Sequence, residues 1–193
     1  MHDVSIRSRG DAFPTPLPEV PPPVAPSPTG AASSPVSAAP WLNQREQRAW
    51  RHYLLMTSQL TVRMNRQLAA EAGISLADYD VLVRLTDTPE GRLRVTKLAR
   101  ELSWEQSRLS HHVARMQRRG LVAREECADD GRGALVVLTE RGRAMIEHAA
   151  PAHVAFVRER VFDVLTEAQV DALDAIATSV LTRLAADDHP SAT

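Results

Sequence analysis

The sequence predicts a mainly α-helical protein that carries one small β-hairpin. Apolar residues after position 40 recur at spacings of three and four, as on one face of a helix. Residue pairs that cap helix N-termini precede several of these stretches. The hairpin is predicted from strands over about 121–126 and 134–138, since the glycine-flanked stretch DDGRG between them is typical of a hairpin tip.

The first forty residues differ in composition from the rest of the chain. Ten of the thirteen prolines lie between Pro14 and Pro40, among alanine, serine and valine. Proline lacks a backbone N–H donor, so residues 1–40 are predicted to be a disordered tail with polyproline II character. The stretch PEVPPPVAP would also suit a proline-recognising module, but a solvated tail or an over-long translation start is the simpler interpretation. The folded domain is expected over 41–186, with a short C-terminal tail at 187–193.

Long helices are expected at both ends of this domain. The first ends at Gly73 and has one seam, formed by Trp50, Leu54, Thr57, Thr61, Met64 and Leu68. Thr139 caps another long helix, which Pro151 should kink rather than end because helical patterning resumes beyond it. Thr166 and Gln169 form a capping box before the last helix. That helix has its own seam of Val170, Leu173, Ala177, Val180 and Leu184.

These seams are too long for one small core to cover. The terminal helices, about 41–72 and 140–186, are therefore predicted to join two copies of the chain in a homodimer.

The middle of the domain, about 75–139, is organised differently. Ser75 and Asp78 resemble a capping box that opens a second helix, and DTPEGR after it is expected to be a loop. A short helix is predicted over Leu93–Leu102, and another over Ser103–Gly120, directly before the hairpin.

The helix before the hairpin has two distinct faces. Leu109, Val113 and Met116 share one side, whereas the other side and its flanks carry hydroxyl, imidazole and guanidinium groups. Such groups hydrogen-bond base edges and phosphates in a major groove. The candidate DNA-contacting residues here are Ser107, Arg108, Ser110, His111, Arg115 and Arg118. A helix whose charges only face water would not explain the preceding short helix, the tight turn and the hairpin, which together predict a winged helix–turn–helix.

The charge distribution supports this interpretation, although the net charge of −1 does not. Between Gly91 and Arg143 there are twelve Lys/Arg residues and seven Asp/Glu residues, whereas the rest of the chain has eleven and seventeen. A basic region within an acidic chain is typical of a nucleic-acid-binding surface.

The stretches KLARELSWEQSRLSHHVARMQRRGLV and DDGRGALVVLTERGRAMI resemble the MarR family of bacterial transcription regulators, over about residues 41–186. The most specific elements are the RRGLV junction and an Asp-x-Arg wing signature, met by Asp130 and Arg132. The resemblance implies a homodimer, joined by its terminal helices, that binds double-stranded DNA at a palindromic operator. It also implies that Arg132 enters the minor groove while Asp130 holds the wing in place. Trp104 and the paired histidines depart from the commoner family pattern.

The resemblance further implies a repressor that a small-molecule effector releases from DNA. Family effector pockets lie between the dimerisation helices and the DNA-binding lobe, so Trp50, Tyr53, Asp80 and Arg84 are candidate contacts for a small aromatic or anionic effector. The simpler interpretation of Asp80 and Arg84 is a surface salt bridge between residues four apart. Cys127 at the foot of the wing is expected to be a packed or idle thiol, and a redox-responsive regulator is the alternative.

Several other classes of protein are not favoured. The chain has no G-x-S-x-G, phosphate-cradling glycine loop or H-E-x-x-H, so an enzyme is not expected, and no cofactor is implied. His148 and His153 are five apart, off the spacing for two helical zinc ligands, and are interpreted as surface residues. A winged-helix protein-interaction module stays open, but it would not need the basic outer face or Arg132.

The expected compartment is the cytoplasm. A single cysteine rules out an internal disulfide framework and favours a reducing environment. No signal peptide is recognised, and no stretch approaches the roughly eighteen apolar residues that a membrane span needs.

Overall fold

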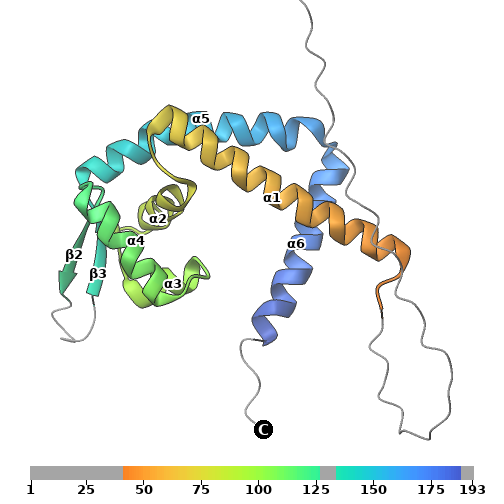
Figure 1. Ribbon diagram of the computed structural model, residues 1–193, viewed down its shortest axis with the longest axis horizontal. Helices are drawn as coiled ribbons and strands as arrows, with labels where there is room; N and C mark the ends of the chain where they lie inside the picture. The colour runs from red at the N-terminus through yellow and green to blue at the C-terminus, as the bar shows by residue number, and fades with distance from the viewer. Residues whose placement is uncertain (1–40, 127–133, 188–193) are drawn as a thin grey trace, which may run out of the picture. The chain divides into compact units, whose positions relative to one another are not determined.

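Helices and one small sheet alternate along the chain in the computed structural model, which describes residues 41–126 and 134–187 (Figure 1). The helices and strands are α1 Gln44–Ala72, α2 Leu76–Thr86, β1 Arg92–Arg94, α3 Val95–Glu101, α4 Gln106–Arg118, β2 Val122–Glu126, β3 Ala134–Leu138, α5 Glu140–Arg160, the 3-10 helix η1 Phe162–Val164 and α6 Glu167–Asp187. The predicted fold class, mainly α with a small hairpin, is confirmed.

Local capping contacts set where the helices begin. Ser75 and Asp78 form the predicted capping box of α2, in which each side chain accepts a hydrogen bond from the other residue's backbone N–H, at 3.1 and 3.0 Å. The Thr139 hydroxyl accepts from the backbone N–H of Gly142 at the start of α5. Helix α1 has a capping box that was not predicted, between Asn43 and Glu46.

The predicted ends of the long helices also agree with the structure. Helix α1 ends at Gly73, which has the left-handed φ of +64° that glycine adopts readily. Helix α5 continues through Pro151 to Arg160, so this proline does not end it.

The predicted helix over Leu93–Leu102 is wrong at its start. Arg92–Arg94 form strand β1, which pairs antiparallel with β3 in a sheet of order β1-β3-β2. Leu93 is buried opposite Val136, whereas its two arginine neighbours are exposed. The sheet at the base of the wing therefore has three strands instead of two.

The predicted helix from Ser103 is also wrong at its start. Ser103 has φ +53°, and the backbone N–H groups of Ser103 and Trp104 donate to Arg100 and Ala99 in α3. These bonds close the end of α3, so α4 begins only at Gln106. The turn between the two helices is thus longer than the sequence pattern indicates.

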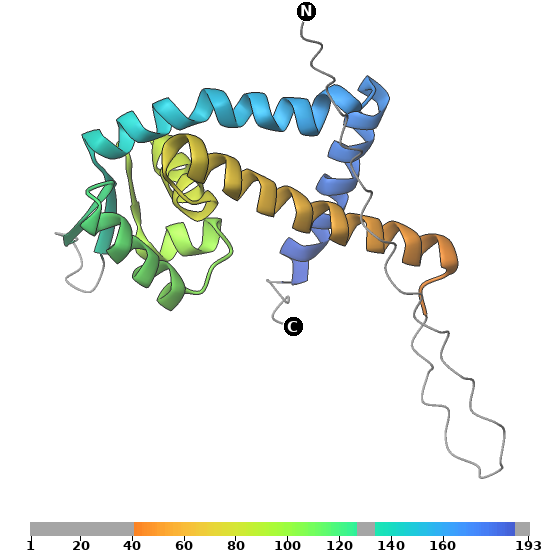
Figure 2. The same ribbon diagram turned by 45° about the horizontal axis from the view of Figure 1, so that its top comes forward.

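The hydrophobic core lies among α2, α3, α4 and the sheet, with contributions from the end of α1 and the first half of α5. Its least exposed large side chains are Leu68, Ile74, Leu82, Leu85, Leu98, Leu109, Met116 and Leu121. Helices α1 and α5 pack along each other, and they lie side by side in both ribbon views (Figures 1 and 2).

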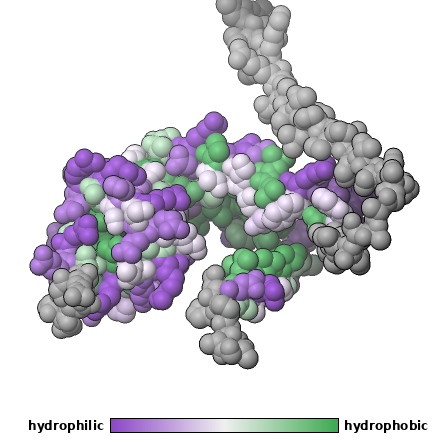
Figure 3. All heavy atoms as spheres, turned by 60° about the horizontal axis from the view of Figure 1, so that its bottom comes forward, coloured by the Kyte–Doolittle hydropathy of each residue, from purple (hydrophilic) through white to green (hydrophobic). Residues whose placement is uncertain are grey.

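The apolar seams of the terminal helices are largely uncovered in the single chain. In α1 only Leu68 of the predicted seam is buried, and Trp50 is 52% exposed. Helix α6 has no buried residue, and Figure 3 shows hydrophobic side chains on its surface. Its most exposed large apolar residues are Ile176, Val180, Leu181 and Leu184.

Candidate nucleic-acid interface

Helix α4 presents a buried face to the core and a polar face to solvent, as the sequence predicts. Leu109, Val113 and Met116 have no exposed surface. The candidate residues Ser107, Arg108, His111, Arg115 and Arg118 are exposed, and Ser110 is half-buried. Helix α4 therefore has the buried face and the exposed polar face that were predicted. The contact of these residues with DNA stays a prediction.

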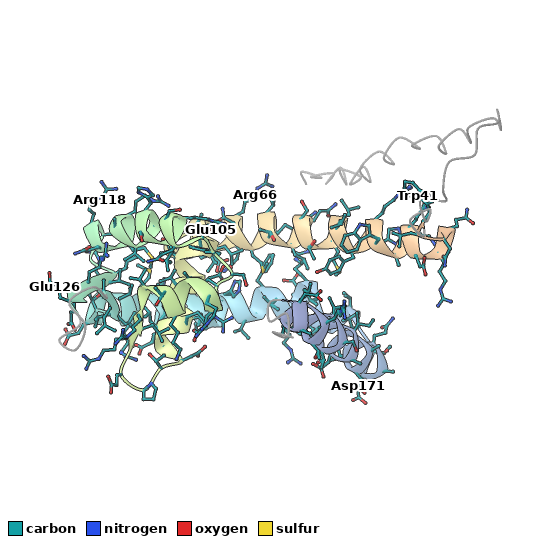
Figure 4. The ribbon with its side chains drawn as sticks, turned by 90° about the horizontal axis from the view of Figure 1, so that it is seen from below. Trp41, Arg66, Glu105, Arg118, Glu126 and Asp171 are labelled. Atoms are coloured by element: carbon teal, nitrogen blue, oxygen red, sulfur yellow. The ribbon has the colours of Figure 1, made fainter. Side chains whose placement is uncertain are left out.

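The outer face of α4 is shallowly hollowed rather than flat. The depression is lined by His111, Ala114, Arg115, Gln117 and Arg118. In Figure 4 Arg118 projects away from one end of α4, and Glu105 lies at the other end. Arg115 and Arg118 lie in the last turn of the helix, where positive charge complements the helix dipole.

A buried carboxylate, Asp78 at the start of α2, fastens α4 to the rest of the domain. It is 4% exposed, and its Oδ2 accepts a hydrogen bond of 2.7 Å from Nη1 of Arg119, the residue after α4. Nη2 of Arg119 donates to the carbonyl oxygen of Gly73 at 2.8 Å. His112 Nε2 lies 2.9 Å from Asp78 Oδ1, a close polar contact that is not aligned as a good hydrogen bond.

These contacts control the ionisation of Asp78. Burial raises the pKa of its carboxyl group, but the contact with His112, the backbone N–H of Ser75 and the guanidinium of Arg119 outweigh burial. The pKa of Asp78 is therefore held far below its ordinary range, and the carboxylate is charged at neutral pH. A charged residue with several polar contacts thus lies where α1, α2 and α4 meet.

His112 is not among the residues predicted to contact DNA. This side chain is 7% exposed, its Nδ1 lies 2.8 Å from Nη2 of Arg115, and the ring of Trp104 packs edge-on against it. Its spacing gives a signal for burial, because His112 lies three residues after Leu109 and four before Met116. Of the paired histidines, His111 is therefore outside and His112 inside.

The wing is described only at its base. Strands β2 and β3 pair over five residues each, with Val136 fully buried at the centre of β3. Arg92 on β1 makes ion pairs with Glu90 at 2.9 Å and with Glu125 of β2 at 3.8 Å. The predicted wing residues Asp130 and Arg132, and also Cys127, lie outside the described residues.

Comparisons with known proteins agree with this geometry. A family model described as MarR family matches residues 72–133. Sco3205 of Streptomyces coelicolor, a MarR family transcriptional regulator solved in complex with DNA, is 38% identical, with a TM-score of 0.72 over 80% of this chain and 94% of that one. AbsC, a MarR family regulator of the same organism, is 36% identical, with a TM-score of 0.72 over 76% and 98% of the two chains. An uncharacterised HTH-type transcriptional regulator of Bacillus cereus is 27% identical over 132 residues, 68% of this chain and 85% of the relative.

The chain belongs to the MarR family. MarR proteins are DNA-binding transcription regulators rather than enzymes. Membership of the family confirms the prediction of a DNA-binding transcription regulator and the prediction that the chain is not an enzyme. In the parts of the chain that the structure describes, no helix has the length and apolar character to cross a bilayer.

The four candidate effector contacts of this MarR protein lie in two separate places on the chain. Trp50 and Tyr53 stack on each other in the first half of α1, with ring centroids 5.6 Å apart and about half of each residue exposed. Asp80 and Arg84 lie on α2, which follows the far end of α1. Asp80 interacts electrostatically with His153, which contacts Gln67 of α1, and with a rise of about 1.5 Å per residue Trp50 is roughly 26 Å along α1 from Gln67. One chain therefore does not bring the two pairs together.

Asp80 is not the surface residue that the salt-bridge interpretation supposes. It is half-buried. Burial raises the pKa of its carboxyl group, while the charges of Arg84 and His153 act in the opposite direction. Asp80 and Asp78 thus lie two residues apart on one helix and have opposite pKa shifts.

The interpretation of His153 as a surface residue is wrong. The residue is 8% exposed, its Nδ1 lies 3.2 Å from the Gln67 side-chain oxygen, and its ring packs against Tyr79 at 4.4 Å. The physical reason is position, because His153 continues the buried face that Ile146 and Ala149 begin on α5. Burial lowers its pKa.

His148 is exposed, as expected. Among the residues described, no three histidine, cysteine or acidic side chains gather as a metal site would require.

Proposed function

We propose that this MarR-family protein is a sequence-specific regulator that binds double-stranded DNA as a homodimer and represses transcription until an effector releases it. The observation that carries the proposal is the exposed row of polar and basic side chains on α4, above an inner face that is fully buried and fastened through Asp78. The 38% identity with Sco3205, solved in complex with DNA, supports the same function.

In this proposal α4 lies in the major groove, with its exposed side chains toward the bases. Ser107 and His111 contact base edges, and Arg118 at the end of the helix contacts phosphate. Arg132 reaches the adjacent minor groove, where a narrow A·T-rich groove attracts a guanidinium group, and Asp130 holds the wing.

The proposed dimer rests on the uncovered apolar surface. Helix α6 exposes Ile176, Leu181 and Leu184 by more than half, and such a surface is typical of an interface rather than of a solvated helix. Two copies would present two α4 helices to half-sites about 10–10.5 base pairs apart, which matches a palindromic operator.

The proposal also includes release by a small aromatic or anionic molecule. The stacked rings of Trp50 and Tyr53 could hold a planar group, and the exposed guanidinium of Arg84 could pair with an anion. Because these residues are separate within one chain, a pocket that used both pairs would need the second copy. A panel of aromatic carboxylates, added to the protein–operator complex, tests this part: we expect release by at least one of them and loss of that response in Arg84→Ala.

The test of DNA binding is selection of duplexes from a randomised library, followed by affinity measurements at several salt concentrations. Wild type should bind a palindromic sequence and lose affinity steeply as salt rises. His111→Ala should relax the preference at one operator position at a cost of about 1–3 kcal/mol. Arg118→Ala should weaken all sequences alike and flatten the salt dependence, and Arg132→Ala should lower affinity with little change in the major-groove preference.

The matched control is Arg66→Ala, which removes an exposed arginine that projects from α1 instead of α4 (Figure 4). Arg66→Ala should bind as wild type does. Absence of duplex binding by wild type would overturn the proposed function and favour a protein-interaction module. If Arg132→Ala binds every duplex as wild type does, the minor-groove role must be abandoned.

A further inference from the structure

A continuous row of side-chain contacts begins in the turn before α4 and runs along one flank of that helix. The guanidinium carbon of Arg108 lies 4.5 Å from the centroid of the Trp104 ring, a cation–π contact. Trp104 in turn packs edge-on against His112, with centroids 5.4 Å apart and planes at 85°. One turn further along, His112 Nδ1 lies 2.8 Å from Nη2 of Arg115.

The inner residues of this row are fixed and the outer ones are exposed. Trp104 is half-buried and packs against the hydrophobic core, and His112 is buried beside the Asp78 carboxylate. Arg108 and Arg115 are exposed on the side of α4 that we assign to DNA. The row thus connects two exposed cations to the interior of the domain.

The contacts also determine the state of the His112 ring. The guanidinium of Arg115 can only donate hydrogen bonds, so Nδ1 of His112 must accept, and the ring proton lies on Nε2, facing Asp78. A ring with both neighbours defined in this way has one orientation. Because the His112 ring has one orientation, the Trp104 ring packs against it in one position.

We propose that Trp104 and His112 are positioning residues, which hold the guanidinium groups of Arg108 and Arg115 in place before DNA binds. This inference rests on the proposed function. Arginine has a large rotamer entropy, so an arginine that is already ordered loses less freedom when it reaches a phosphate or a base. The two residues therefore increase affinity without touching DNA.

A double-mutant cycle on Trp104 and Arg108, with the selected operator, tests the inference. Arg108→Ala should weaken binding and reduce the salt dependence by about one phosphate contact. Trp104→Leu should weaken binding roughly two- to fivefold, as expected for loss of an exposed cation–π contact, and should leave the salt dependence unchanged because Arg108 is still present. In the Arg108→Ala background, Trp104→Leu should have no further effect.

Trp104→Phe is the conservative control, since it keeps an aromatic face below Arg108 and should retain most of the affinity. The thermal midpoint of each variant shows whether it is folded at the assay temperature. Should Trp104→Leu be unfolded there, Trp104→Met replaces it, because the flexible methionine side chain packs into irregular space and has no ring face. A parallel cycle of His112→Leu with Arg115→Ala measures the second contact in the row.

The outcomes separate the inference from the function on which it rests. If wild type binds no duplex, the proposed function fails and the inference fails with it. If wild type binds, but the effects of Trp104→Leu and Arg108→Ala simply multiply, only the positioning role is overturned. An unchanged affinity of Trp104→Leu would overturn it as well.

Discussion

Replacement of Asp78 by asparagine should destabilise the protein strongly, although the two side chains have the same shape. Asparagine can still accept one hydrogen bond from the backbone N–H of Ser75, but it has no charge to offer His112 and Arg119. The close contact of the buried carboxylate with the His112 ring is not well aligned, and we expect it to contribute about 2 kcal/mol, near the lower end of the range for a hydrogen bond to a charged group. The contact with Arg119 counts for less, about 1 kcal/mol, because that side chain is 42% exposed and screened by water.

Together these losses amount to about 3 kcal/mol at pH 7, or a thermal midpoint lowered by roughly 6–12 °C for a chain of this size. The assay is urea and thermal unfolding followed by circular dichroism. Wild type and variant are compared at one protein concentration, because association would also change the midpoint.

The pH dependence gives a second, independent check. The folded-state pKa of Asp78 lies below the value of about 3.9 that an unfolded carboxyl group has. Its ionisation therefore stabilises the fold fully above about pH 5, and this contribution is lost as pH falls from about 4 through the folded-state pKa. The stability difference between wild type and Asp78→Asn should shrink over that range. An equal difference at pH 7 and pH 3, or none at pH 7, would refute the reasoning.

Asp80→Asn is the matched control, two residues further along α2. Burial raises the pKa of Asp80, so its charge costs the folded state free energy that asparagine does not. We therefore expect Asp80→Asn to be as stable as wild type or slightly more stable. If both variants lose the same stability, the effect at Asp78 comes from helix capping or packing and not from its ionic contacts.

The remaining predictions concern the backbone, the tail and the dimer. A methyl group at Gly142 would overlap the carbonyl oxygen of Leu121, so Gly142→Ala should lose about 3 kcal/mol in urea unfolding. Gly73→Ala has free space and should lose only the roughly 1–2 kcal/mol of its left-handed backbone; equal losses would contradict this account. Deletion of residues 1–40 should leave the thermal midpoint and operator affinity nearly unchanged, and a large loss of either would mean that the tail docks. If the protein is the proposed homodimer, Val180→Asp should sediment as a monomer at micromolar concentration where wild type sediments as a dimer, and a dimeric Val180→Asp would place the interface elsewhere.

The features predicted correctly from the sequence depend on residues close together in the chain. The Ser75–Asp78 capping box involves residues three apart, and the two faces of α4 follow from helix geometry alone. Strand β1 was not predicted, because three residues give too short a pattern and the strand forms only by pairing with β3, about forty residues later.

The exposed polar face of α4 was predicted from the sequence, but the buried contacts that hold this helix in place were not. Asp78 was recognised only as a capping residue, since its partners His112 and Arg119 lie 34 and 41 positions away. The burial of His153 was missed for a related reason. Its spacing from Ala149 indicates the core, but a histidine is tolerated there only because Gln67 of α1 supplies a hydrogen-bonding partner.

Arg119 has a consequence for any attempt to redesign this regulator. Its two hydrogen bonds, to Gly73 and to Asp78, join the residue that caps the end of α1, the first turn of α2 and the end of α4. A change in the direction of α4 would therefore break these hydrogen bonds unless α1 and α2 moved with it. Variants intended to change the proposed half-site spacing should therefore change the paired helices α1 and α5 and leave residues 73–78 as they are, because these residues hold the end of α4.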